Sequence, residues 1–399
     1  MEKKYSFRFV LALSLFVSVL VCLVTALVLT RSQGFAKNRF GKHLGFVEDY
    51  STILEIIDEM YIGQFDEDAV TTMAMRAAVG SLGDGWSYYL TPDEYASFVD
   101  DSNNRFAGIG VNVFLDEETG GMGVQSVYSN SAAEAAGIVA DDVIIAIDGE
   151  DITGETVETM RNRLMRDIGD TVELTVLRKN GDINIVTVVY DYVFVDPVMY
   201  ELLNGNIGYI DISNFDLGAA DGFISAVDDL IAQGAVGFIF DVRENGGGWV
   251  EEMTQMLDYL LPEGEIFIVS DNKGNESIIE SDPDSIEMPC VTLINHNSYS
   301  AAEYFAATLG EYNYAKVVGE QTSGKNRMQS TYILPGGGAL HISTGQYLTK
   351  NRVSLHDTNG LTPDYTVVLT DEEYELFKTG NLDKSDDPQL ALALELLIS

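Results

Sequence analysis

The sequence predicts an α/β protein that carries an inserted small β-barrel, a helical region before it and one transmembrane helix near its N-terminus. Three observations predict this architecture. Strand-like and helix-like segments alternate from residue 205 onward, short strand-like runs separated by turns fill residues 105–190, and residues 10–30 carry no charge. With 399 residues, 46% of them hydrophobic, and only 8 Pro, the chain can fill more than one core and lacks the composition of a disordered protein.

The strongly acidic charge of the chain excludes one class of partner. The 63 acidic and 23 basic residues give a formal net charge of −40. Seven basic residues and one acidic residue lie in residues 1–42, so the remainder carries 62 acidic against 16 basic residues. A surface of that sign repels phosphate backbones, and we expect no nucleic-acid partner. The only two cysteines, Cys22 and Cys290, are far apart in the sequence, which excludes haem and zinc sites built on thiolates.

Residues 10–30 form an uncharged run that is long enough to cross a membrane. As a helix, a run of this length spans about 30 Å. A cleaved signal peptide would have a shorter apolar region followed by a small-residue cleavage site. This run is longer and has no convincing cleavage site, so we prefer an uncleaved transmembrane anchor. We therefore expect residues 1–9 to be a cytoplasmic tail of a single-pass cell-membrane protein whose acidic body is extracytoplasmic.

Residues 43–98 are expected to form a helical region. Apolar residues recur at spacings of three and four over residues 44–60, which is typical of an amphipathic helix, and a second helix is expected over 68–82. A third helix begins near Thr91, because the sequence Thr-Pro-Asp-Glu supplies a capping residue, a proline in the first helical position and acids in the first turn.

Residues 99–192 are expected to form a separate, partly open β-barrel. Turn sequences such as Asn180-Gly181-Asp182 separate its strand-forming runs, and one helix is expected over 156–166. The strands are expected at residues 110–115, 123–128, 142–147, 171–178 and 183–190.

The entrance to the first of these strands can bind a carboxylate. The segment FAGIGV, residues 106–111, has two glycines whose backbone N–H groups can face an anion because no Cβ blocks the approach. The segment SNSAAEAAGIVADDVIIAIDGEDITG, residues 129–154, follows in the order found in PDZ domains, so this module resembles a PDZ domain. The resemblance implies that peptide tails bind at the loop and add a strand to the sheet edge. The peptide-binding residues would be Gly108, Ile109, Gly110 and Val111.

Residues 193–399 are expected to form the α/β domain, and two of its strand-to-helix junctions carry candidate catalytic groups. The first, Asn245-Gly246-Gly247-Gly248, leaves free backbone N–H groups after a buried strand. The second places Ser300 at a helix start with small residues behind it. Together they can supply a hydroxyl and two N–H donors to an oxyanion. A serine at a helix start is more often an N-cap, so a catalytic role for Ser300 requires a base.

Lys325 is the preferred base for Ser300. The alternatives, His296, His341 and His356, form no His-Asp arrangement at a recognisable spacing. Lys325 follows a glycine-containing turn between two expected strands. It acts as a base only if burial lowers the pKa of its amine from about 10.4 to about 7.5, against the negative charge of the body. A solvated surface lysine is the other interpretation.

These segments together resemble the C-terminal processing peptidases, also called tail-specific proteases. Lys325 follows Ser300-Ala301-Ala302-Glu303 at the family's spacing, and Gln329 lies four residues further on. The segments LGDGWSYYLTPDEYASF, IGYIDISNFD, FDVRENGGG and DPQLALALELL also occur in the family's order. The resemblance implies a crotonase/ClpP-like α/β protease core in which Ser300 is the nucleophile, Lys325 the general base and Gln329 the residue that orients the lysine.

The same resemblance implies further roles. Ala301 and Gly247 would supply the oxyanion N–H groups, with Gly246 as the alternative to Gly247, and Arg166 would couple peptide binding to the protease domain.

The expected function is that of a membrane-anchored serine endopeptidase. It would select protein or peptide substrates through their C-termini and cleave them through an acyl-enzyme, with no metal or organic cofactor. A homo-oligomer is left open. One alternative is a catalytically silent PDZ scaffold that holds peptide tails at the cell surface. The other is a Ser-His hydrolase that uses His296 or His341.

Overall fold

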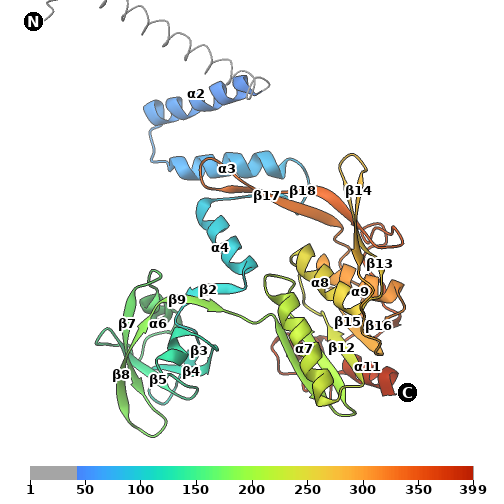
Figure 1. The fold of residues 1–399 in the computed structure, drawn as a ribbon. Coiled ribbons are helices and arrows are strands. Elements are labelled where there is room, and N and C mark those ends of the chain that lie inside the picture. The colour runs from blue at the N-terminus through green and yellow to red at the C-terminus, as the bar shows by residue number, and fades with distance from the viewer. Residues whose placement is uncertain (1–42, 399) are drawn as a thin grey trace, which may run out of the picture. The chain divides into compact units, whose positions relative to one another are not determined.

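The structure is a computed structural model that describes residues 43–398 (Figure 1). The chain forms two compact units, with the boundary in the sequence between Ala77 and Ala78. The first unit holds α2 (Leu44–Met60) and most of α3 (Glu67–Gly80). The hydroxyl of Tyr50 donates to Thr71 Oγ1 at 3.2 Å and joins the two helices. Both helices therefore lie where the sequence predicts them, although α3 is shifted toward the N-terminus by one residue at its start and two at its end.

The predicted transmembrane helix needs correction. No helix within residues 43–398 is both long and apolar enough to cross a membrane. The longest of them, α2, has 17 residues and includes five acidic ones, whereas a spanning helix needs about 20 mostly apolar residues. The run at residues 10–30 lies outside the described part of the chain. The single-pass topology and the cell-membrane location that depended on it are therefore withdrawn.

The second unit is built around a six-stranded sheet with the order β10-β11-β12-β15-β16-β19. All neighbouring pairs are parallel except β10 and β11, which are antiparallel. The strands are β10 (Val198–Leu203), β11 (Ile207–Ile212), β12 (Gly237–Asp241), β15 (Cys290–Ile294), β16 (Ala315–Gly319) and β19 (Tyr365–Thr366). The alternation of strands and helices predicts this parallel α/β arrangement, and the structure confirms it.

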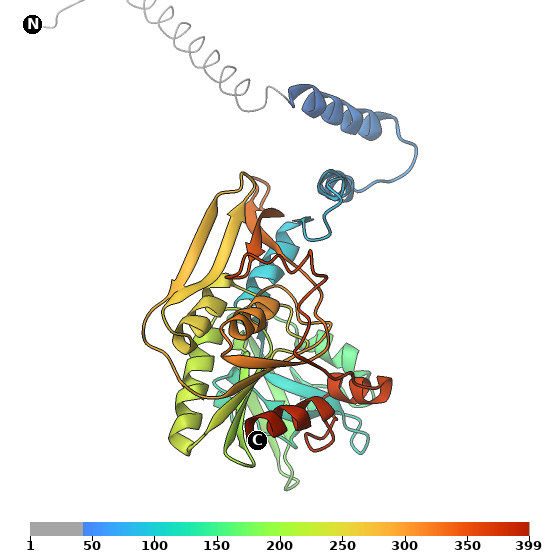
Figure 2. The same cartoon turned by 90° about the vertical axis from the view of Figure 1, so that its right-hand side faces the viewer.

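Helices cover both faces of this sheet, so its central strands are buried on both sides (Figure 2). One core joins the sheet to α7 (Ala219–Gln233), α8 (Val250–Leu260) and α9 (Ala301–Glu311). A second, smaller core joins the other face to α11 (Pro388–Ile398). The remaining helix of the domain, α10 (Asp371–Lys378), follows β19 and begins with a capping box at Thr370.

A second sheet lies beside the first and is built mainly around β18 (Ala339–Leu348). Its strand order is β1-β18-β13-β14, and β17 also pairs with β18. The other strands are β1 (Tyr88–Leu90), β13 (Gly264–Asp271), β14 (Glu276–Ser281) and β17 (Arg327–Ile333). The short strand β1 lies inside the region that the sequence predicts to be helical. Local sequence patterns do not reveal it, because it forms by pairing with β18, which is far away in the chain. The helix predicted to start at Thr91 is present as α4 (Pro92–Ser102), with Thr91 as its N-cap.

The inserted module is a β-rich unit with its own core. Its sheet has the order β3-β4-β5-β7-β8, with β6 paired to β5, and β2 pairs separately with β9. The strands are β2 (Arg105–Gly108), β3 (Val111–Leu115), β4 (Met122–Val127), β5 (Val143–Ile147), β6 (Glu150–Asp151), β7 (Thr171–Leu177), β8 (Ile183–Val189) and β9 (Asp191–Phe194). Two helices complete it, α5 (Ala132–Ala135) and α6 (Val157–Leu164). All five predicted strands and the predicted helix are present.

Candidate active site

Ser300 lies on a strained turn between the buried strand β15 and helix α9. Its backbone has φ 59° and ψ −125°, a conformation that non-glycine residues rarely adopt. The residue is 6% exposed. The helix then begins at Ala301, and no described residue accepts a hydrogen bond from the Ala301 N–H. The turn therefore places a hydroxyl beside an available backbone donor.

A buried carboxylate holds this turn and the Lys325 loop together. Glu303 is fully buried, and its Oε2 accepts the N–H groups of Ser300 at 3.0 Å and Lys325 at 2.9 Å. Its Oε1 accepts the N–H of Gly324 at 2.6 Å and the hydroxyl of Thr322. Burial raises the pKa of Glu303 even though these hydrogen bonds act in the opposite direction. One side chain therefore fixes the backbone on both sides of the candidate dyad.

The amine of Lys325 faces aromatic rings and no described carboxylate pairs with it. Its Nζ lies 4.3 Å from the centroid of the Trp86 ring and 5.7 Å from that of Tyr299. Burial lowers the pKa of Lys325 to about 8, although the charges of Glu303 and Asp84 act to raise it. At pH 7 about a tenth of an amine with that pKa is neutral, compared with about one in several thousand for an ordinary lysine.

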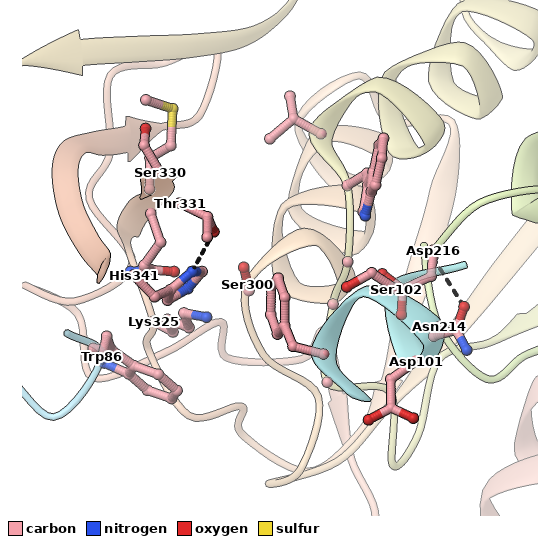
Figure 3. Close-up of a pocket in the computed structure, with 18 of the residues that line it drawn as sticks. Trp86, Asp101, Ser102, Asn214, Asp216, Ser300, Lys325, Ser330, Thr331 and His341 are labelled. Atoms are coloured by element: carbon pink, nitrogen blue, oxygen red, sulfur yellow. Dashed lines mark hydrogen bonds between the residues drawn. The ribbon is translucent and has the colours of Figure 1, made fainter. Parts of the chain in front are cut away.

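Ser300 and Lys325 line one cavity of about 1110 Å³ (Figure 3). At one end, Asp101, Ser102, Asn214 and Asp216 contribute polar groups. Burial raises the pKa of Asp216 to about 6, with the charges of Asp101 and Glu252 adding to the effect. Apolar side chains from several elements also line the cavity: Val250, Val269, Ile279, Met328 and Tyr347. The cavity is large enough and sufficiently mixed in character to take an extended peptide.

The glycine turn packs directly against Ser300. Gly247 has φ 92°, and a Cβ on it would lie 2.8 Å from Ser300 Cβ and 3.0 Å from Ala301 N. Only glycine fits so close to the serine. In this conformation the Gly247 N–H donates to Asn245 Oδ1 at 2.8 Å, so it is already engaged. An oxyanion hole that uses Gly247 requires this N–H to leave Asn245, whereas the Gly246 N–H has no acceptor among the described residues.

Gln329 lines the cavity but does not contact Lys325. Its side-chain amide donates to Arg327 O at 2.8 Å and to Ser343 Oγ at 3.2 Å. The structure therefore brings Gln329 near the candidate dyad without the orienting hydrogen bond that the family resemblance implies. No hydrogen bond joins Ser300 Oγ to Lys325 Nζ either.

The histidines occupy different environments. His341 lines the cavity, but its Nδ1 shares a hydrogen bond of 2.8 Å with Thr331 Oγ1 and its ring stacks on Tyr88. Burial and the nearby Lys325 lower the pKa of His341. His296 is half exposed and does not line the cavity, and its Nδ1 lies 3.5 Å from Glu320 Oε2. No histidine in the described chain is hydrogen-bonded to Ser300.

The predicted peptide loop lies in the inserted module, away from this cavity. Gly108 ends β2 and Val111 begins β3, which is an edge strand and can accept an added strand. Ile109 and Gly110 use their carbonyls to accept backbone N–H groups of the same module, and no described residue accepts their own N–H groups. Arg166 pairs with Asp148 at 2.5 Å and does not reach the cavity.

Two features around the site could not be predicted from the sequence. Trp86 is far from Lys325 in the sequence, and only its place among glycines in a short aromatic segment marks it. The second is a buried ionic network in which Arg243 pairs with Asp241 at 2.5 Å and with Asp387 at 2.8 Å. Burial opposes the charge of Arg243, but these carboxylates outweigh it and raise the pKa of the guanidinium. The network connects the end of β12, which lies just before the glycine turn, to the start of α11.

No group of three His, Cys, Asp or Glu side chains within residues 43–398 is arranged to hold a metal ion. On the wall that Ser300 and Lys325 share, the cavity presents a hydroxyl, an amine of lowered pKa and backbone N–H donors. This set is the one that acyl transfer with a covalent intermediate requires.

Comparisons with known proteins identify the families that this chain resembles. Residues 206–367 match peptidase family S41, and residues 107–189 match the PDZ domain. The carboxy-terminal processing protease CtpA of Bacillus subtilis is 29% identical over 79% of this chain and 68% of its own length. A carboxyl-terminal-processing protease of Picosynechococcus is 30% identical over 81% of this chain and 78% of its own length. A crystal structure described as an S41 protease from Bacteroides fragilis, 18% identical, covers 85% of this chain and 92% of its own with a TM-score of 0.53, which supports the fold.

Proposed function

Because this chain belongs to the carboxyl-terminal-processing proteases of peptidase family S41, and is thus a serine protease, we propose that Ser300 is its nucleophile and Lys325 its general base. The observation that carries the proposal is the lowered pKa of an amine without a carboxylate partner, on the wall of the cavity that Ser300 also lines. A neutral lysine amine is the form that can accept a proton from a serine hydroxyl.

In the proposed mechanism, Lys325 Nζ takes the Ser300 proton as Oγ attacks the scissile carbonyl. The N–H of Ala301, with that of Gly247 or Gly246, stabilises the oxyanion. The Lys325 ammonium then protonates the leaving amine, and water hydrolyses the acyl-enzyme. The Lys325 side chain must first move toward Ser300, because no hydrogen bond joins the two in the described conformation.

We further propose that the PDZ module selects substrates through their C-termini. Its edge strand β3 accepts the tail as an added strand, and free N–H groups of the loop at Ile109 and Gly110 bind the terminal carboxylate. The role of Arg166 as a coupling residue stays a prediction, since Arg166 is paired with Asp148 inside the module.

The experiment is covalent labelling of the full chain with a fluorophosphonate, followed by mass spectrometry of the modified peptide. We expect labelling at Ser300 that is lost in Ser300→Ala and Lys325→Met. Cleavage of an unstructured peptide should follow the same pattern. The catalytically silent scaffold would instead bind tails without being labelled, and retained turnover in Lys325→Met would refute the assigned base.

A further inference from the structure

Hydrogen bonds hold the backbone of the turn that carries Trp86, just before β1. Asp84 accepts the N–H of Trp86 at 3.2 Å and the hydroxyl of Ser87 at 2.6 Å, so the turn is closed by its own side chains. Ser87 Oγ in turn accepts the N–H of Ser343 on β18 at 3.0 Å. The next residue, Tyr88, pairs with β18 opposite His341. The turn is thereby attached to the sheet that borders the cavity.

Trp86 then forms an aromatic wall with Tyr299, the residue before Ser300. The two rings lie 5.8 Å apart at an interplanar angle of 38°. Lys325 Nζ lies over the Trp86 ring (Figure 3). Both rings line the same cavity as the amine. Trp86 itself is 37% exposed, so part of its side chain meets solvent while its ring also meets the amine.

We propose that Trp86 is a positioning residue for the general base: its ring keeps water from the amine of Lys325 on the wall of the cavity that Ser300 also lines. The inference rests on the proposed Ser300–Lys325 mechanism. Trp86 touches neither the nucleophile nor the scissile bond in this role, and it acts through the lysine alone.

Two effects of the ring on Lys325 oppose each other. An indole face attracts an ammonium and favours the charged form. The same ring excludes water and disfavours the charged form. Burial is the largest cause of the lowered pKa of Lys325, and the Trp86 ring that lies over its amine is part of what buries it. Removal of the ring should therefore return the pKa toward its ordinary value.

Other ionisable groups around Lys325 do not account for the lowered pKa. Glu303 from α9 and Asp84 from the turn before β1 both act to raise it. His341 from β18 has a pKa below its ordinary value of 6.5, so it is neutral over the range in which Lys325 titrates. Tyr299, the residue before Ser300, presents its ring to the amine, with the ring centroid 5.7 Å from Nζ. These groups stay in place when Trp86 is replaced.

The test measures the rate of Ser300 acylation by a fluorophosphonate from pH 6 to pH 10.5 in the full chain. In Trp86→Ala, the acid limb should move up by about one pH unit or more, which lowers the rate at pH 7 about tenfold or more. The rate on the alkaline plateau should stay within about twofold of the parent. Trp86→Phe keeps an aromatic face and should shift the limb by less. Tyr332→Ala is the matched control, since Tyr332 is an exposed aromatic residue of β17 outside the cavity.

A fluorescence titration tests the contact without any catalysis. The chain has two tryptophans, so Trp249→Phe leaves Trp86 as the single reporter. Its emission should change with a midpoint near the acid limb, because a charge appears beside the indole, and the transition should disappear when Lys325→Met is added. Thermal unfolding of each variant shows whether it is folded.

The outcomes separate the two proposals. An acid limb unchanged in Trp86→Ala, or moved to lower pH, overturns the role of Trp86 and leaves the dyad standing. An equal loss of rate at every pH also overturns it, because that is the result of a merely structural role. A parent chain that is not labelled at any pH, but whose Trp86 emission titrates with Lys325, refutes the dyad and retains the contact.

Discussion

Glu303→Gln is the substitution whose effect the structure defines best. Each carboxylate oxygen of Glu303 accepts two hydrogen bonds: Oε1 from Gly324 and Thr322, Oε2 from Ser300 and Lys325. An amide replaces one of these oxygens by an NH2 group, so two buried donors lose their acceptor whichever way the glutamine is oriented.

The cost follows from those two donors. Each buried donor left without a partner costs about 1–3 kcal/mol, so the free energy of unfolding should fall by about 2–6 kcal/mol. This is a large share of the roughly 5–15 kcal/mol that stabilises a typical domain. The loops that carry Ser300 and Lys325 should also separate, and acylation of Ser300 should slow by more than tenfold.

The assay is urea unfolding followed by circular dichroism, with fluorophosphonate labelling measured under native conditions. Glu263→Gln is the matched control, because Glu263 is exposed and no described residue forms a hydrogen bond with its side chain. The reasoning would be refuted if Glu303→Gln and Glu263→Gln had the same unfolding midpoint and labelled at the same rate.

Three further predictions follow from the same geometry. Gly247→Ala should abolish labelling of Ser300 and cost about 1–3 kcal/mol, since the new methyl group meets the serine at a positive φ; unchanged labelling would contradict this. Arg243→Met should lower stability in urea by about 3–5 kcal/mol, because two buried carboxylates lose their partner, and a change below about 1 kcal/mol would contradict it. The peptidase rate should rise about tenfold per pH unit up to about pH 8 and then level off, because the base is the neutral amine of Lys325, and a limb near pH 10 would contradict it.

Local pattern predicts Ser300 better than it predicts the rest of the site. A buried strand followed by small residues at a helix start is contained within about a dozen residues, and the structure has that junction as expected. Lys325 requires the family resemblance, because a Gly-Lys pair in a loop is equally typical of a solvated surface. Its burial depends on Trp86, which the pairing of β1 with β18 brings there from a distant part of the chain.

One sequence pattern could have revealed part of the role of Glu303. The pattern Ser-x-x-Glu at a helix start predicts that the acid reaches back to the N–H of the serine, as it does here at 3.0 Å. The sequence does not show that the same carboxylate also accepts two N–H groups of the Lys325 loop. That arrangement depends on how β16 and β17 are placed around α9.

The central claim, that Lys325 is a base of lowered pKa beside Ser300, is tested most directly by its own titration. Trace acetylation of the full-length Ser300→Ala chain, over a range of pH, reports the neutral fraction of each amine through the mass of its peptide. We predict a midpoint near pH 8 for Lys325, with the exposed Lys179, whose pKa is raised by its pairing with Asp141, as an internal reference. A midpoint for Lys325 that coincides with that of Lys179 would contradict the account.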